Sequence, residues 1–183
     1  MRGKSHRCLG KYLVQHYMGD TPERYVKAFL LGCIEPDRNP ATYLKGSIRC
    51  QWLRGHNYRN ARRFMRAISA RLEKKEKLGL FDYYTLGKLI HYTTDAFTYA
   101  HNDTFPTALS DHREYEAALQ DHFLEYMKQD PKVNPKIAGS VMEAIYSYHR
   151  EYEAQAANIY TDTRFALNAC CCVLAVLLTN PIF

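Results

Sequence analysis

Apolar side chains recur at the spacing of an α-helix along most of this 183-residue sequence, whereas the two-residue alternation typical of β-strands is hard to find. Segments rich in turn-forming residues interrupt the pattern: "GDTP", "IEPDRNP", "HNDTFPT" and "QDPKVNP". Hydrophobic residues make up 46% of the chain, which is enough to form a core. The pattern therefore predicts an all-α fold, a single multi-helical domain of six or seven helices over residues 1–183.

The expected helices follow from the periodic segments and their capping residues. Thr21 is a suitable N-cap, and Pro22 suits the first position of the helix that follows. We expect helices at 5–17, 22–32, 58–77, 83–100, from 110 or 111 to 128, 136–156 and 163–178. The segment 34–40 is expected to be a loop, and no repeat or linker divides the chain.

Charge and cysteine usage exclude some classes of protein. The net charge of +6 suits anionic partners, but it is moderate, and ordinary surface charge explains it better. Six cysteines occur without a CxxC pair, so a thiolate zinc finger is not indicated. Cys170, Cys171 and Cys172 point about 100° apart on a helix and cannot face one point, so we expect reduced, buried thiols.

The two ends of the sequence carry no targeting signal that we can identify. The first twenty residues contain basic residues but neither an apolar core nor a small-residue cleavage site. Near the other end, "ACCCVLAVLL" is too short to cross a bilayer and is better explained as part of a buried helix. A cytoplasmic location is the resulting expectation.

The segment "HYTTDAFTYAH" places three possible metal ligands in a mostly apolar helix. His91 and Asp95 are four residues apart, so on a helix they share a face and can bind one ion. His101 lies about 80° around the helix from His91, where it would miss that ion but could bind a second one nearby. This spacing indicates a cluster of ions.

Further ligands occur on both sides of this segment. His112 and Glu116 form a second pair at i, i+4 on the next expected helix. Asp37 lies in the proline-rich turn, and His56 and His6 lie near helix starts. The predicted metal ligands are His6, Asp37, His56, His91, Asp95, His101, His112 and Glu116. Their nitrogen and oxygen donors, without sulfur, suit zinc.

Each residue of this set also has a simpler structural explanation. A lone histidine is usually a surface or hydrogen-bonded core residue, and a single histidine–carboxylate pair is often a surface salt bridge. The recurrence of the pair at 112 and 116 favours the metal interpretation. His16, His122 and His149 have no comparable partners, and we expect them to have no metal role.

In order and spacing, these residues resemble the zinc-dependent phospholipase C family. The resemblance extends from residue 6 to 116 and is strongest at "LGKLIHYTTDAFTYAHN"; the openings "KSHRCLGKYLV" and "AFLLGCIEPD" are similar to shorter bacterial members. The fungal single-strand-specific zinc nucleases have a related fold. The resemblance implies a helical bundle that binds two or three Zn²⁺ ions.

The resemblance also implies an assignment of ligands to ions. Asp37, His56, His91 and Asp95 would bind one zinc, and His101, His112 and Glu116 a second. His6 and Asp95 would bind the third, so that Asp95 bridges two ions. Zinc-activated water would hydrolyse a phospholipid headgroup, with Asp37 as the catalytic residue that orients or deprotonates the water.

The sequence departs from the secreted members of this family in two places. Their third zinc is completed by an N-terminal tryptophan, whereas this sequence begins with Met1 and has Trp52 as its one tryptophan. Arg38 follows Asp37, where choline-specific members have an aromatic residue, so choline is not favoured and an additional negative charge on the substrate is.

Several alternatives remain open at this level. A zinc nuclease on single-stranded nucleic acid shares the metal chemistry, and fifteen tyrosines could stack on bases. A non-catalytic, zinc-stabilised helical protein is the alternative from another class; it would require closed four-ligand sites, which seven or eight ligands for two or three ions do not provide. HD-type phosphohydrolases need an adjacent His-Asp pair, and a P-loop needs its glycine motif; the sequence contains neither.

The expected partner is a phospholipid or other phosphodiester, with transient contact at a membrane surface.

Overall fold

A computed structural model describes residues 1–39, 58–102, 109–136 and 138–178. Within these ranges every regular element is helical, and none is a strand, which confirms the all-α prediction. The elements are α1 (Gly3–Tyr17), α2 (Glu23–Arg38), α3 (Tyr58–Leu72), α4 (Leu80–Ala96), the 3-10 turn η2 (Tyr99–His101), α5 (Leu109–Lys128), α6 (Val141–Glu153) and α7 (Ile159–Leu178).

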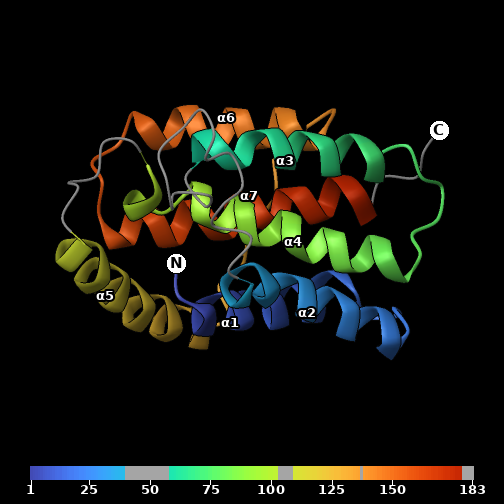
Figure 1. The fold of residues 1–183 in the computed structure, drawn as a ribbon, viewed down its shortest axis with the longest axis horizontal. Coiled ribbons are helices and arrows are strands. Elements are labelled where there is room, and N and C mark those ends of the chain that lie inside the picture. The colour runs from blue at the N-terminus through green and yellow to red at the C-terminus, as the bar shows by residue number, and fades with distance from the viewer. Residues whose placement is uncertain (40–57, 103–108, 137, 179–183) are drawn as a thin grey trace.

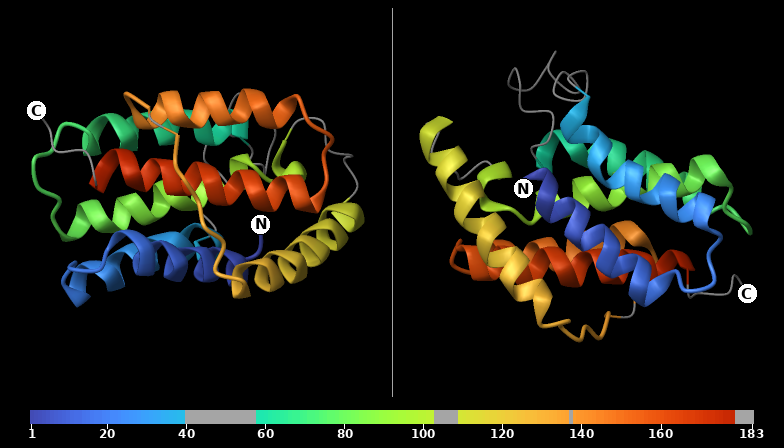
Figure 2. Two further views of the ribbon diagram at one scale, coloured as in Figure 1. Left: turned by 180° about the vertical axis from the view of Figure 1, so that it is seen from behind. Right: turned by 90° about the horizontal axis from the view of Figure 1, so that it is seen from below.

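The helices form tiers around two central ones. In Figure 1, α4 and α7 lie in the middle, with α3 and α6 on one side and α1 and α2 on the other. The most extensive helix pairing joins α2 to α4, and α5 packs against α1 and α7. Figure 2 shows α5 beside α1, with the N-terminus entering between α5 and the end of α4. This arrangement places the N-terminus inside the helical bundle, near the end of α4.

The central position of α4 explains why its sequence is mostly apolar. Every residue from Leu89 to Ala96 is buried, including His91 and Asp95, whose side chains have no exposed surface. A helix that is apolar all round is stable only inside a protein. Burying an imidazole and a carboxylate there is costly unless each has a charged or hydrogen-bonding partner. The position of these two residues therefore requires polar neighbours from other helices.

The last helix is also central, as its sequence predicts. Ile159–Leu178 is the one helix in the described ranges long and apolar enough to cross a bilayer, but 67% of its apolar window is buried inside the protein. Cys170, Cys171 and Cys172 are free and fully buried. They face different neighbours: Cys170 Sγ lies 3.5 Å from Thr94 Oγ1, and Cys172 Sγ lies 3.1 Å from the Lys136 carbonyl. The three thiols do not share a site, as their helical spacing predicted.

The prediction that residues 34–40 form a loop was wrong for the part that the structure describes. Helix α2 continues through Pro36 to Arg38, so Asp37 lies in its last turn. Gly32, expected near the end of the helix, is instead a packing position. A Cβ at Gly32 would lie 2.0 Å from the Tyr84 carbonyl oxygen, and one at Gly87 would lie 2.1 Å from the Phe29 carbonyl oxygen. These two glycines let the backbones of α2 and α4 touch.

The Gly87→Ala variant is expected to lower the free energy of unfolding by about 3 kcal/mol or more, because backbone atoms cannot move aside as a flexible side chain can. Gly19→Ala is the control, since its added methyl group would have no neighbour within 4 Å and should change stability by less than about 0.5 kcal/mol. Urea denaturation of both variants measures the difference. Equal stability of the two variants would contradict the close contact.

The helix predicted over 83–100 was also wrong at its end. Helix α4 ends at Ala96; Thr98 is extended, and His101 lies in the separate turn η2. The side-chain amide of Asn102 donates hydrogen bonds to the carbonyls of Ala96 and Thr98, at 3.2 and 2.9 Å. These bonds satisfy carbonyl groups that a continuing helix would have paired internally. The break changes the direction in which His101 points.

Smaller differences occur at other helix ends. Helix α3 stops at Leu72 instead of residue 77, and α6 covers Val141–Glu153 instead of 136–156, with the Ser140 hydroxyl accepting a hydrogen bond from Glu143 N at its start. Helix α7 begins at Ile159, one turn earlier than predicted.

Candidate metal centre

Six of the eight predicted ligands gather into two neighbouring groups. In each group, three ligand atoms lie within 4.8 Å of one another: His6, His91 and Asp95 form the first, and His101, His112 and Glu116 form the second. The first group joins α1 to α4, and the second joins η2 to α5. Asp37 lies beside the first group, whereas His56 lies outside the described residues.

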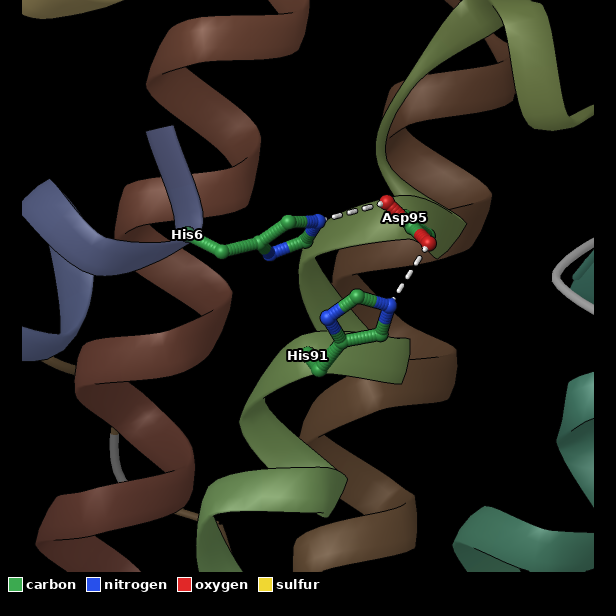
Figure 3. A group of neighbouring side chains, drawn as sticks. All are labelled: His6, His91 and Asp95. Carbon is green, nitrogen blue, oxygen red and sulfur yellow. Dashed lines mark ion pairs between the residues drawn. The ribbon is translucent and has the colours of Figure 1, made fainter. Parts of the chain in front are cut away.

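The first group is buried and centred on a carboxylate. His6 Nε2 lies 3.2 Å from Asp95 Oδ1, and His91 Nε2 lies 3.3 Å from Asp95 Oδ2 (Figure 3). The two imidazole rings stack with their centroids 3.9 Å apart. His6 Nε2 is buried and makes no hydrogen bond within the described part of the chain. A buried nitrogen without a hydrogen bond, aimed at a carboxylate, is what a metal ligand looks like when its ion is removed.

The backbone of α2 fixes the tautomer of His91. His91 Nδ1 lies 3.0 Å from the Cys33 carbonyl oxygen, which can only accept, so Nδ1 carries the proton and donates. The lone pair of the neutral ring is therefore on Nε2, which faces Asp95 Oδ2 and lies 3.6 Å from Asp37 Oδ1. Metal-binding histidines are commonly oriented by such a bond from the far nitrogen.

Asp37 occupies the margin of the first group. Its Oδ1 lies 3.6 Å from His91 Nε2, and its Oδ2 lies 4.0 Å from His6 Nε2. Its side chain is 23% exposed, whereas Asp95 has no exposed surface. Asp37 is therefore the carboxylate of this group that solvent and a substrate can reach.

The second group lies closer to the surface and is linked to the first through Asp95. His101 Nε2 is 3.2 Å from Glu116 Oε1, and His112 Nε2 is 3.6 Å from Glu116 Oε2. His101 Nε2 also lies 3.8 Å from Asp95 Oδ1. Asp95 thus stands between the two groups, with one oxygen toward each of its histidines on α1 and α4.

A positive charge occupies the space between the groups. The amino group of Met1 lies 2.8 Å from Asp95 Oδ1, 2.9 Å from Glu116 Oε1 and 2.8 Å from His101 Nε2. Although burial opposes its charge, the two carboxylates raise the pKa of this amino group to about 10. No local signal links residue 1 to a carboxylate 94 positions away; the one indication was the resemblance, whose secreted members have an N-terminal residue at a zinc ion.

The electrostatics of the site favour an ionised carboxylate at Asp95 and a neutral imidazole at His6. Burial disfavours the charged form of Asp95, but His101, the Met1 amino group and His91 hold its pKa well below the usual range. Burial, followed by repulsion from His91, lowers the pKa of His6 to about 4. His6 is therefore neutral at neutral pH and can donate its lone pair to a metal ion. Asp95 is anionic and can share one.

These donors fit zinc. Imidazole nitrogen and carboxylate oxygen are both zinc ligands, and neither group in the described ranges contains a thiolate. His6 Nε2, 3.2 Å from Asp95 Oδ1, and His91 Nε2, whose lone pair is left free by the bond at Nδ1, both face Asp95. Among the described residues each group has three ligands, the number that catalytic zinc sites take from the protein.

The histidines expected to have no metal role lie outside both groups. His16 Nε2 is 2.8 Å from Asp130 Oδ1, and His122 packs edge-on against Tyr160. His149 stacks on Tyr58 with the ring centroids 3.6 Å apart. Each has a local structural partner, and His149 Nδ1 also lies 3.5 Å from Glu153 Oε1, an i, i+4 pair that the sequence analysis did not note; the absence of a metal role stays a prediction.

Asp162 holds the backbone next to the second group. It was not identified from the sequence. It is fully buried in the first turn of α7 and accepts three hydrogen bonds: from Tyr99 N at 2.8 Å, from the Tyr115 hydroxyl at 2.8 Å and from the Tyr152 hydroxyl at 2.7 Å. Tyr99 begins the turn that carries His101. Asp162 therefore anchors the backbone that positions a ligand.

The Asp162→Asn variant is expected to lower the free energy of unfolding by about 2 kcal/mol, because an amide cannot accept all three bonds and a buried donor is left unpaired. It should also weaken zinc binding at the second group about tenfold, as changes behind a ligand commonly do. Competition with a chromogenic chelator measures the affinity. The exposed Asp121→Asn is the control; if both variants bind zinc like the wild type, Asp162 has no positioning role.

Comparison with known proteins identifies the family of the chain. The family model for zinc-dependent phospholipase C matches residues 5–159, which include all eight predicted ligands. No curated protein and no solved structure matches the chain.

Proposed function

Because the chain belongs to the zinc-dependent phospholipase C family, we propose that it cleaves the phosphodiester bond of a phospholipid headgroup. One observation carries the proposal: side chains from α1, α4, η2 and α5 converge on two adjacent groups of nitrogen and oxygen donors joined by Asp95. Two neighbouring cation sites suit a phosphodiester, because the anionic substrate repels an attacking oxygen until its charge is neutralised.

The roles of the protein ligands follow from their positions. His6, His91 and Asp95 would hold one zinc ion, and His101, His112 and Glu116 another, with Asp95 between them. The finer assignment that the resemblance implies, with Asp37 and His56 beside His91 and Asp95 at one ion and His6 with Asp95 at a third, stays a prediction. When bound, zinc supplies positive charge for the phosphate oxygens and lowers the pKa of a coordinated water toward about 7.

Asp37 is the proposed catalytic residue. Its carboxylate is partly exposed and lies 3.6 Å from His91 Nε2, so it can accept a hydrogen bond from a water held between the first group and the substrate. Removing that proton strengthens the water as a nucleophile. The buried Asp95 cannot take this role, because its oxygens already face two imidazoles and the Met1 amino group.

The proposed reaction is hydrolysis in one displacement. The water oxygen forms a bond to phosphorus while the bond from phosphorus to the glycerol oxygen breaks. The proton lost by the water is balanced by the proton that the departing glycerol oxygen gains from solvent. The products are diacylglycerol and the phosphate monoester of the headgroup, and no covalent intermediate on the protein is needed.

A lipid substrate also requires at least transient contact with a membrane surface, and this contact is part of the proposal. The cytoplasmic location stays a prediction.

The test is turnover of bis(p-nitrophenyl) phosphate by the zinc-loaded protein. We expect release of nitrophenol that a chelator reduces at least about 100-fold and that added zinc restores. Protein that is folded and zinc-loaded, yet inactive on this ester and on phospholipid vesicles, would support the non-catalytic alternative. Faster turnover of single-stranded DNA than of phospholipid would support the nuclease alternative.

A further inference from the structure

A cavity beside the metal centre lies between α1 and α2. Its volume is about 490 Å³, within the usual range of roughly 300–1,000 Å³ for small-molecule sites. Four cationic side chains line it: Lys4, Arg7 and Lys11 from α1, and Arg38 from the end of α2. Positions 4, 7 and 11 follow one another at helical spacing, so these three side chains share one face of α1.

The four cations differ in their ion pairing from several lysines elsewhere on the protein. None of them has an ion-pair partner within the residues that the structure describes, and all four are exposed. Elsewhere on the surface, cations such as Lys75, Lys88 and Lys136 each lie within 2.8 Å of a carboxylate oxygen. Asp37 is the one carboxylate among the described lining residues, so four cations around the cavity are only partly balanced unless an anion binds there.

The cavity borders the metal centre at Asp37. Asp37 lines it while lying 3.6 Å from His91 Nε2. Gly3, also in the wall, lies against the same carboxylate, since a Cβ at this position would be 3.5 Å from Asp37 Oδ2. A phosphodiester held at the metal centre could therefore extend its headgroup past Asp37 to the four cations.

We propose that this cavity binds a second anionic group of the substrate, a phosphate monoester carried on the headgroup beside the scissile phosphodiester; this rests on the proposed function. A phosphate monoester carries a charge of about −1.5 to −2 and three acceptor oxygens. The guanidinium groups of Arg7 and Arg38 can bind such oxygens in pairs, and the two lysines add charge. A quaternary ammonium headgroup would instead need aromatic rings, and none of the described residues that line the cavity is aromatic.

The test compares two lipids that differ only in the phosphate monoester: phosphatidylinositol 4-phosphate and phosphatidylinositol. Vesicles of each, diluted in phosphatidylcholine to equal surface charge, are tested for co-sedimentation with the zinc-loaded protein and for hydrolysis. We expect at least about tenfold tighter binding and at least about tenfold higher kcat/KM with phosphatidylinositol 4-phosphate. Equal values for the two lipids, or a preference for phosphatidylcholine, would overturn the proposal.

Matched double variants assign any preference to the cavity. In Arg7→Gln/Lys11→Gln the ratio between the two lipids should fall to within about twofold of one. The control Arg24→Gln/Lys27→Gln removes the same charge from exposed positions of α2 that do not line the cavity, and it should keep the wild-type ratio. Retention of the preference in the cavity variant, or its loss in the control, would contradict the assignment to this cavity.

Two further readouts separate this proposal from others. Co-sedimentation does not depend on turnover, so a protein that binds phosphatidylinositol 4-phosphate selectively but hydrolyses no phosphodiester would overturn the proposed function and support the binding site.

Calorimetric titration with inorganic phosphate identifies the source of the anion. We expect it to bind at least about tenfold more weakly than the soluble headgroup glycerophosphoinositol 4-phosphate, and equal binding would overturn the lipid assignment.

Discussion

Replacing Asp95 with asparagine is expected to lower kcat/KM for a phosphodiester at least about 1,000-fold and to reduce the bound zinc in both groups. Its side chain has no exposed surface, and its oxygens lie 3.2 Å from His6 Nε2, 3.3 Å from His91 Nε2 and 3.8 Å from His101 Nε2. The amide of asparagine has one oxygen and no charge, so it cannot serve both groups. No other described carboxylate has contacts with histidines of both groups.

The matched control for this variant is Asp82→Asn, which changes another buried aspartate of α4. Asp82 lies at the opposite end of that helix, where it accepts a hydrogen bond from Gly79 N and pairs with Lys75 and Arg71. We expect this variant to lose about 1 kcal/mol of stability, because its cationic partners are largely exposed, and to keep its zinc. Metal analysis and turnover are measured on both variants. Full zinc content and activity in Asp95→Asn would rule out its linking role.

The second large effect is expected for Asp37→Asn, which should lower kcat about 100- to 10,000-fold while two zinc ions remain bound. Asparagine keeps the shape of the side chain but cannot take a proton from water. The two groups of three ligands do not include Asp37, so its loss should not empty them. This separation of turnover from metal content distinguishes a catalytic carboxylate from a purely structural ligand.

Glu35→Gln is the control for Asp37→Asn, because Glu35 lies on the same helix and its carboxylate faces away from the metal centre. It accepts from Lys88 Nζ at 2.8 Å and from Asn39 Nδ2 at 2.7 Å. We expect kcat of this variant to stay within about threefold of the wild type. If Asp37→Asn is as active as Glu35→Gln, the role proposed for Asp37 is incorrect.

The sequence predicts the helices well because their apolar faces repeat at a fixed spacing. Helix α4 and the buried α7 follow from that pattern alone. The exact ends were harder to predict. Pro36 and Gly32 are both typical of helix ends, but the first lies within α2 and the second serves the contact with α4. A local signal cannot distinguish a glycine that ends a helix from one that lets two helices touch.

Part of the metal centre could be predicted because two of its ligand pairs are local. His91 with Asp95, and His112 with Glu116, are each four residues apart, so their contact follows from helix geometry. The contact between His6 and Asp95 depends on how α1 packs against α4, which no local spacing in the sequence determines. Asp162 could not be recognised, since a single acidic residue early in a helix is usually a favourable charge at its N-terminus.

The central claim is that these side chains share divalent cations, and the most direct measurement is the zinc content of the purified, folded protein. After incubation with zinc at neutral pH and removal of the unbound metal, elemental analysis should find two or three ions per chain. Zinc binding should also raise the thermal midpoint, because the metal binds the folded state. Folded protein that retains no zinc after this treatment, and whose thermal midpoint zinc does not change, would contradict the claim.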